Sequence, residues 1–173
     1  LQGASDGTLS LAINEILTAN GSVLPDFEGD FCDIIEIKNT SAAAISTKGY
    51  FISDTKTNRA RCALPDKTLA PGEMLLVFAS GKDLVTEDGE FHTDFKLSAN
   101  EEVILSYGNN FVSQAVARCD SNYSQSRMSG GEYVTMLATP GFENDEAIIS
   151  VTMNFAQAKK GGCIVKSILG NNL

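Results

Sequence analysis

The fold is decided by the stretch Leu69-Ala70-Pro71-Gly72-Glu73-Met74-Leu75-Leu76-Val77-Phe78-Ala79-Ser80-Gly81. It opens with a turn, because Pro71 presets φ for the second turn position and Gly72 accepts the positive φ that a type II turn needs next. The apolar run 74–78 follows without a break and ends at Ala-Ser-Gly. A run this short is typical of a strand buried on both faces, since a helix would need at least ~10 residues. We therefore expect residues 74–78 to form a central strand of a packed β structure.

Short apolar segments on both sides of this stretch predict further strands. These expected strands are residues 9–17, 32–39, 49–54, 59–64, 102–107, 111–117 and 132–137, with a further strand at 95–97. The loop 108–110 between two of the runs is rich in Gly and Asn, which is a hairpin signal. No stretch has the pattern of an amphipathic helix, and the connections are short. The sequence therefore predicts an all-β chain, and the number and spacing of strands favour a two-sheet β-sandwich over a barrel.

The segment 32–39 shows the alternation of a half-buried strand. Ile35 and Ile37 share one face, while Glu36 and Lys38 share the other. Successive side chains of a strand point to opposite sides of the sheet. We therefore expect Glu36 and Lys38 to face solvent.

Composition limits the classes of partner. The chain has 173 residues, 43% of them apolar, and a formal net charge of −9. This charge argues against binding nucleic acid or anionic membranes, both of which attract basic surfaces. No apolar run approaches the ~20 residues that a membrane-spanning helix needs. We expect neither nucleic acid nor membrane insertion among the interactions of this chain.

The acidic loop 26–30 is the one candidate for metal binding. A solvated connection is the first interpretation of this loop. The second is a calcium site formed by Asp26, Glu28 and Asp30, because calcium prefers clustered carboxylate and carbonyl oxygens. With Asp33 added, the same carboxylates could serve a metal-assisted hydrolase. The spacing does not fit an EF-hand loop.

His92 is the only histidine in the sequence and lies two residues before Asp94. Such a pair could act as a general base and its orienting acid. A nucleophile at matching geometry would also be needed, and the sequence singles out none. We therefore expect His92 to be a structural residue and predict no catalytic residues.

Four cysteines occur in the sequence, at positions 32, 62, 119 and 163. Their long spacings match no zinc or redox motif. We favour buried free thiols, because free cysteine is among the most buried residue types. One or two disulfide bridges are the alternative.

The C-terminal residues 145–173 differ from the preceding pattern. Residues 147–155 and 163–169 could pair as a hairpin around the loop 156–162. An isolated two-stranded hairpin is barely stable in water, so it would dock on the sandwich or on another chain. Residues 145–173 are thus the predicted C-terminal extension, and a homo-oligomer could form through it.

Several short motifs in the middle of the chain together resemble the lamin tail domain family, over about residues 11–144. The matching pieces are residues 13–16, 33–39 (Asp-Ile-Ile-Glu-Ile-Lys-Asn), 49–54, 64–72, 78–83, 92–98, 126–127 with Gly130-Gly131, and 139–144 (Thr-Pro-Gly-Phe-Glu-Asn). No single piece is specific, but their order and spacing are. This chain departs from the family in lacking tryptophan: Ile34 and Tyr133 stand where the family often has Trp.

The resemblance implies an immunoglobulin-like two-sheet β-sandwich, with a flexible segment 1–8, a domain at 9–144 and the extension 145–173. Bacterial members of the family look like non-catalytic accessory modules of larger exported or cell-surface proteins. They have no catalytic residues or cofactor to carry over. The expected location is therefore extracellular or at the cell surface, and the expected partner is a protein or another component of the cell envelope.

Overall fold

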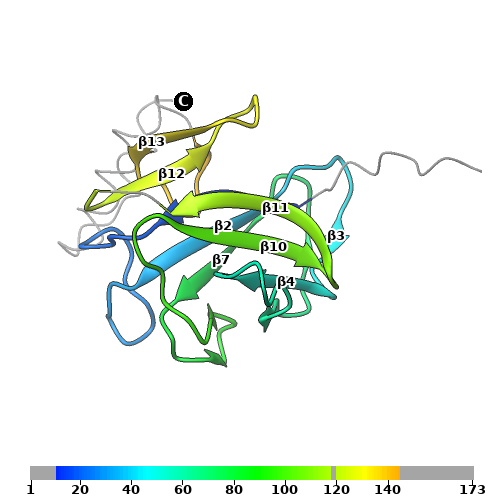
Figure 1. The fold of residues 1–173 in the computed structure, drawn as a ribbon, viewed down its shortest axis with the longest axis horizontal. Coiled ribbons are helices and arrows are strands. Elements are labelled where there is room, and N and C mark those ends of the chain that lie inside the picture. Colours follow the sequence, from blue (N-terminus) through cyan, green and yellow to red (C-terminus); the bar gives the residue numbers. More distant parts are fainter. Residues whose placement is uncertain (1–10, 118–119, 145–173) are drawn as a thin grey trace, which may run out of the picture.

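The structure is a computed structural model that describes residues 11–117 and 120–144. Every regular element in this part of the chain is a β-strand (Figure 1). No helix long and apolar enough to cross a membrane occurs there. The all-β class predicted from the sequence is confirmed. The expected flexible segment 1–8 and the expected hairpin of 147–155 and 163–169 lie outside the described residues.

The strands form one large sheet and two smaller ones. The large sheet has the order β13 (Tyr133–Leu137), β12 (Tyr123–Arg127), β1 (Leu11–Leu17), β2 (Asp33–Asn39), β7 (Met74–Ala79), β9 (Phe91–His92), β8 (Leu84–Val85). The second sheet has the order β11 (Asn110–Ala117), β10 (Glu101–Tyr107), β4 (Tyr50–Ser53), β5 (Cys62–Ala63). Strands β3 (Ile45–Ser46) and β6 (Thr68–Leu69) pair separately. All pairings are antiparallel except that of β7 with β9.

Strand β7 is the central strand that the opening stretch predicts. It pairs with β2 along its whole length and with β9 at Val77 and Phe78. The turn before it forms as expected, with Gly72 at φ 77° and the Glu73 N–H donating to the carbonyl of Ala70 at 2.9 Å. Leu75 and Val77 enter the main core, whereas Phe78 faces the other side of the sheet. The prediction of a strand paired on both sides is confirmed.

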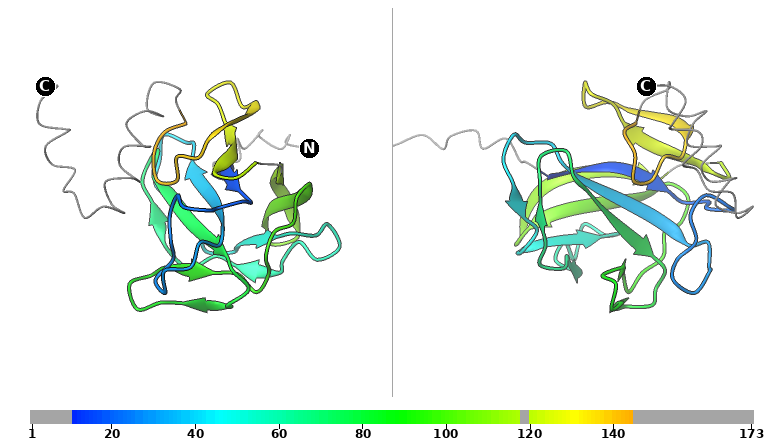
Figure 2. Two further views of the ribbon diagram at one scale, coloured as in Figure 1. Left: turned by 90° about the vertical axis from the view of Figure 1, so that its left-hand side faces the viewer. Right: turned by 180° about the vertical axis from the view of Figure 1, so that it is seen from behind.

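The large sheet and the four-stranded sheet enclose a common core (Figure 2). Ile35 and Val77 of the large sheet belong to the same buried cluster as Ile52 and Leu105 of the four-stranded sheet. This arrangement is sandwich-like, as predicted. A second, smaller cluster lies on the outer face of the large sheet; it contains Leu17, Ile34, Phe78 and Ala138.

The predicted hairpin around residues 108–110 is confirmed. Strands β10 and β11 pair from Glu101 with Ala117 to Tyr107 with Asn110. Only Gly108 and Asn109 remain in the turn, and Gly108 has φ 54°, in the left-handed region that glycine tolerates. The register shifts once, between Leu105 and Ser106.

Two expectations about polar residues were wrong. Glu36 is 0% exposed, and Lys38 is half-buried, instead of facing solvent. The reason is that residues 139–144, more than 100 positions later in the chain, cover this face of β2. None of the expected strands falls between residues 117 and 132, yet β12 spans Tyr123–Arg127. Its Ser124 and Ser126 are buried, so a polar sequence there hides a strand.

Other strands are shorter than expected or were not foreseen. The expected strand 59–64 contracts to β5. The expected strand 95–97 was wrong: Phe91–His92 form β9 instead, and Lys96 makes only an isolated bridge with Ser80. The two-residue strands β3, β6 and β8 had no sequence signal.

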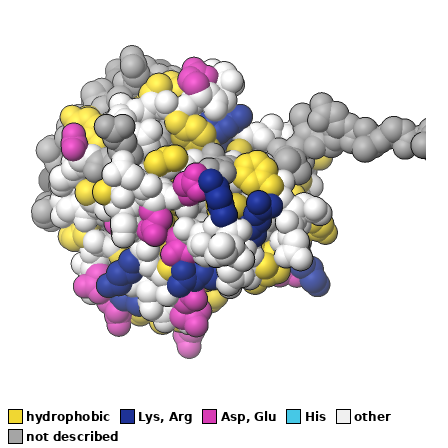
Figure 3. Space-filling view, in the orientation of Figure 1, with side chains coloured by type: hydrophobic (Ala, Val, Ile, Leu, Met, Phe, Trp, Pro, Cys, Tyr) yellow, Lys and Arg dark blue, Asp and Glu magenta, His cyan; other side chains and the backbone are white. Residues whose placement is uncertain are grey.

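On the face shown in Figure 3, acidic and basic side chains are interspersed, and no basic stripe crosses it.

Candidate functional site

The candidate site is built by the segment that follows β13. Residues 138–144, the closing segment, turn back over the outer face of β1 and β2. The backbone N–H of Thr139 donates to Glu15 Oε1 at 2.7 Å, and that of Gly141 donates to Glu36 Oε2 at 2.6 Å. The Asn144 amide donates to the carbonyls of Asn14 and Arg127, at 2.9 and 3.0 Å. These hydrogen bonds fix the closing segment across three strands of the large sheet.

Glu15 and Glu36 form a buried pair of carboxyl groups beneath the closing segment. They lie directly opposite each other on β1 and β2, and their exposed fractions are 2% and 0%. Burial raises the pKa of Glu36 to about 8, and the neighbouring Glu15 adds to this shift. Burial also raises the pKa of Glu15, although the hydroxyls of Ser124 and Ser126 and the Thr139 N–H donate to it. With a pKa of about 8, Glu36 holds its proton at neutral pH.

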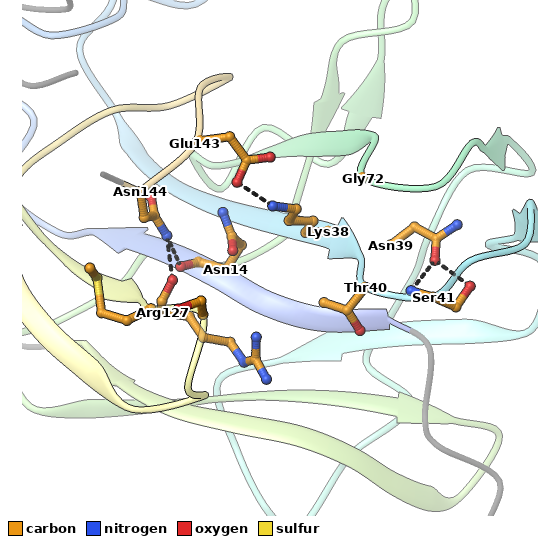
Figure 4. Close-up of a pocket in the computed structure, with 11 residues that line it drawn as sticks. Asn14, Lys38, Asn39, Thr40, Ser41, Gly72, Arg127, Glu143 and Asn144 are labelled. Atoms are coloured by element: carbon orange, nitrogen blue, oxygen red, sulfur yellow. Dashed lines mark hydrogen bonds and ion pairs between the residues drawn. The ribbon is translucent and has the colours of Figure 1, made fainter. Parts of the chain in front are cut away.

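A pocket of about 550 Å³ opens beside the closing segment (Figure 4). Its walls come from β1, the end of β2, the turn before β7, the turn after β12 and the end of the closing segment. The lining residues are Asn14, Lys38, Asn39, Thr40, Ser41, Gly72, Arg127, Met128, Ser129, Glu143 and Asn144. We call this the outer-face pocket. Its size is within the range of small-ligand sites, and its lining is strongly polar.

Three charged side chains line the outer-face pocket. Lys38 forms an ion pair with Glu143 at 2.5 Å. The guanidinium of Arg127 makes no hydrogen bond or ion pair within residues 11–117 and 120–144, and Figure 4 marks none from it to the other lining residues. Asn39 is fully buried and donates to the carbonyls of Ala43, Leu69 and Ala70, so that it shapes the pocket wall. Chemically, the pocket offers one unneutralised cation among amides and hydroxyls.

The predicted metal candidates Asp26, Glu28 and Asp30 do come together, but around a lysine. The Lys82 ammonium lies 2.6 Å from Asp26, 2.6 Å from Glu28 and 3.0 Å from Asp30. Hydrogen bonds with Asp26 and Glu28 raise the pKa of Lys82. Within the described part of the chain, no group of three or more His, Cys, Asp or Glu residues is arranged to hold a metal ion.

Asp26 is the structural centre of this acidic loop. Its side chain is fully buried and accepts the backbone N–H groups of Glu28 and Asp30, at 3.0 and 2.9 Å. Burial alone would raise the pKa of Asp26, but the hydrogen bonds from Lys82 and the two backbone groups outweigh it, and the pKa is lowered. Asp33 lies apart: it accepts the Leu97 N–H, and burial raises its pKa to about 6.

The pair His92 and Asp94 does not form a catalytic dyad. His92 is fully buried, and its two ring nitrogens are 2.8 Å from Ser80 Oγ and 2.8 Å from Glu90 Oε1. Asp94 instead contacts Arg61 Nε and Cys62 Sγ, each at 2.9 Å. Ser80 lines a second pocket, of about 410 Å³. The Ser80 hydroxyl also accepts the backbone N–H of Lys82, a contact typical of a turn that ends a strand.

Two of the four cysteines lie in the described residues, and both are free thiols. Burial raises the pKa of Cys32 and of Cys62 to about 12 in each case. Both are therefore protonated and unreactive at neutral pH. Cys119 and Cys163 lie outside the described residues.

Sequence reasoning did not single out Arg127, Lys38 or Glu143 as site residues. A signal was present, because each belongs to a motif of the lamin tail resemblance: 126–127, 33–39 and 139–144. What the sequence could not show is that these motifs meet at one place. Comparison with protein-family models gives no match for this chain, and comparison with curated proteins gives none either.

Proposed function

We propose that this chain is a non-catalytic binding module of a larger bacterial exported or cell-surface protein, with the immunoglobulin-like sandwich of lamin tail domains. Its partner is a protein or another component of the cell envelope. The proposal rests on the outer-face pocket and on the motif resemblance.

One observation carries the proposal: motifs far apart in the sequence meet at the outer-face pocket. Asn14, Asn39, Gly72, Arg127 and Asn144 come from the motifs 13–16, 33–39, 64–72, 126–127 and 139–144, and all line it. The pocket stands on a paired sheet and is closed by backbone hydrogen bonds to two buried carboxyl groups. A rigid, preorganised polar pocket suits binding, because little ordering remains to be done when a ligand arrives.

The candidates for chemistry are engaged in internal contacts. Asp26 is hydrogen-bonded within its own loop, and His92 is held on both ring nitrogens. The strongest enzymatic alternative is the hydrogen-bonded series Ser80, His92, Glu90, which has the residue types of a nucleophile, a base and an orienting acid. Because Ser80 also accepts a backbone N–H at a strand end, its contacts favour a structural role.

Assays on the purified chain test the non-catalytic assignment. We expect no turnover of ester, peptide, glycoside or phosphoester substrates, and no labelling of Ser80 by a fluorophosphonate. An enzymatic activity that copurifies with the wild-type chain and is lost in Ser80→Ala would refute the non-catalytic assignment. In the parent protein, deleting residues 9–144 should impair localisation or partner binding and leave the parent's own chemistry intact.

The calcium-binding alternative is favoured by the convergence of Asp26, Glu28 and Asp30. The Lys82 ammonium already lies where these three carboxylates converge, so a calcium ion would have to displace an ammonium held at 2.6–3.0 Å. We expect titration calorimetry of the wild-type chain with calcium to give no binding heat. The variant Lys82→Met is titrated in parallel. Calcium binding by this variant alone would show that the Lys82 ammonium occupies the position that a calcium ion would take.

Assembly through residues 145–173 is an addition to the proposed function, not a rival. A strand offered to the exposed edge of a neighbour's sheet is a common mode of association. Light scattering should then show an oligomer for the full chain and a monomer for residues 1–145. A monomer in both cases would exclude assembly through the extension.

A further inference from the structure

We propose that the outer-face pocket binds a carboxylate group of its partner, and that Arg127 is the residue that binds it. This inference rests on the proposed function, because it names the chemistry that a binding module would recognise at the same site. It is carried by the guanidinium of Arg127, by the charges around it and by the backbone that holds it.

Arg127 is a half-buried cation in the wall of the pocket without an acidic partner in the described part of the chain. Arg61, by contrast, contacts both Asp54 and Asp94, at 2.5 and 2.9 Å. A guanidinium that is partly removed from water and left unpaired has lost hydration without a replacement. An anionic ligand would supply that replacement, and the planar fork of arginine matches the two oxygens of a carboxylate.

The local charges favour a singly charged ligand. Lys38 is neutralised by Glu143 at 2.5 Å, so these two rim residues contribute no net charge. Arg127 therefore leaves the pocket with one net positive charge, in a chain whose net charge is −9. A dianionic phosphate would carry one charge more than the pocket can balance. A carboxylate balances the single guanidinium.

The backbone around Arg127 is arranged to hold the guanidinium in place. The carbonyl of Arg127 accepts the Asn144 amide at 3.0 Å, which ties β12 to the closing segment. Gly131, in the turn after β12, has φ 93°, and a Cβ added there would lie 3.2 Å from Arg127 Nη2. Glycine at 131 thus leaves the space that the guanidinium occupies. A preorganised donor of this kind needs little rearrangement to bind an anion.

The test measures binding of a defined probe to the full chain. The probe is the peptide acetyl-Ala-Ala-Ala with a free C-terminal carboxylate, and its C-terminal amide is the uncharged control. We expect the carboxylate peptide to bind saturably and the amide to bind at least tenfold more weakly, because the guanidinium loses its charged partner. Inorganic phosphate should bind more weakly than the carboxylate peptide.

Variants separate the fork of Arg127 from its charge. Arg127→Gln should weaken carboxylate binding by about tenfold or more, and Arg127→Lys should give an intermediate affinity, because lysine keeps the charge but not the fork. Arg59→Gln is the matched control: it removes the same charge outside the pocket and should leave the affinity unchanged. Circular dichroism verifies that each variant is folded.

The outcomes that overturn the inference are distinct. Equal affinity for the peptide acid and amide, equal loss in Arg127→Gln and Arg59→Gln, or tighter binding of phosphate than of carboxylate would each refute it. None of these results depends on turnover, so the inference can fail while the non-catalytic assignment stands.

Discussion

At the scale of single residues, the least expected feature is the buried pair Glu15 and Glu36. Alternation along residues 32–39 placed Glu36 on the solvent face, and that logic is correct for an isolated strand. The closing segment covers this face instead, and its backbone N–H groups donate to both carboxyl groups. A buried polar group costs little when it is hydrogen-bonded, and both oxygens of Glu36 and Oε1 of Glu15 have donors. Glu15 Oε2 is buried without a hydrogen-bond partner among the described residues, so part of the cost of burying this pair stays uncompensated.

The pair makes stability depend on pH in a definite direction. The pKa of Glu36 rises from 4.5 to about 8 on folding, so the folded chain binds more protons than the unfolded chain within this interval. Its contribution to stability is fully present below pH 4.5 and is lost as pH rises through about 8. The slope is at most about 1.4 kcal/mol per pH unit for one proton. The raised pKa of Asp33, about 6, acts in the same direction at lower pH.

Glu36→Gln tests this dependence. Glutamine resembles the protonated carboxyl group but does not titrate, so it should reduce the fall in unfolding free energy between pH 6 and 8 while leaving the chain folded. Urea denaturation at pH 5, 6, 7 and 8 measures the slope. The exposed Glu87→Gln is the control and should behave as wild type. A slope that is unchanged in Glu36→Gln would show that Glu36 is already ionised in the folded chain.

Asp26 and Asp30 make a second comparison at this scale. Both contact Lys82, but the side chain of Asp26 is fully buried and accepts two backbone N–H groups, whereas that of Asp30 is 68% exposed. Asp26→Ala should lower the unfolding free energy by about 1–3 kcal/mol, because two backbone N–H groups and the Lys82 ammonium lose their buried acceptor. Asp30→Ala should change it by less than about 1 kcal/mol. Equal losses in urea denaturation would contradict the structural role of Asp26.

At the scale of elements, continuous apolar runs and turn residues were readable from the sequence. The strand at 74–78, the turn at Pro71-Gly72 and the hairpin at 102–117 all appear where expected. Strand β12 was not readable, because its inward residues are serines. Ser124 and Ser126 are buried as partners of Glu15 beneath the closing segment, so the buried positions of this strand carry hydroxyls instead of apolar groups. Strands of two residues are too short to leave a periodic pattern.

Strand β7 allows a prediction about the core. Val77 is fully buried between β2 and β9, whereas Leu76 is only partly buried on the outer face. Val77→Asp should unfold the domain, because an unpaired buried charge costs several kcal/mol and total stability is ~5–15 kcal/mol. Leu76→Asp should be the milder change. Circular dichroism and urea denaturation compare them; a Val77→Asp chain as stable as wild type would show that β7 is not central.

At the scale of the whole molecule, the sequence supplied the parts of the candidate site without its location. Lys38, Arg127 and Glu143 lie in motifs 33–39, 126–127 and 139–144, but a pattern in one dimension does not show which loops meet. The sequence pointed instead to the acidic loop 26–30 as the candidate site, because clustered carboxylates can be recognised within one short segment. Lys82 contacts all three carboxylates of that loop from a position more than 50 residues away, which no local pattern reveals.

The most direct test of the outer-face pocket as the binding site is a map of amide chemical-shift changes. The ¹⁵N-labelled full chain is titrated with acetyl-Ala-Ala-Ala bearing a free carboxylate. We expect saturable changes that cluster at Lys38, Thr40, Arg127, Ser129 and Asn144, which line the pocket. Changes that do not saturate, or that cluster at the acidic loop 26–30 or around Ser80, would contradict the assignment.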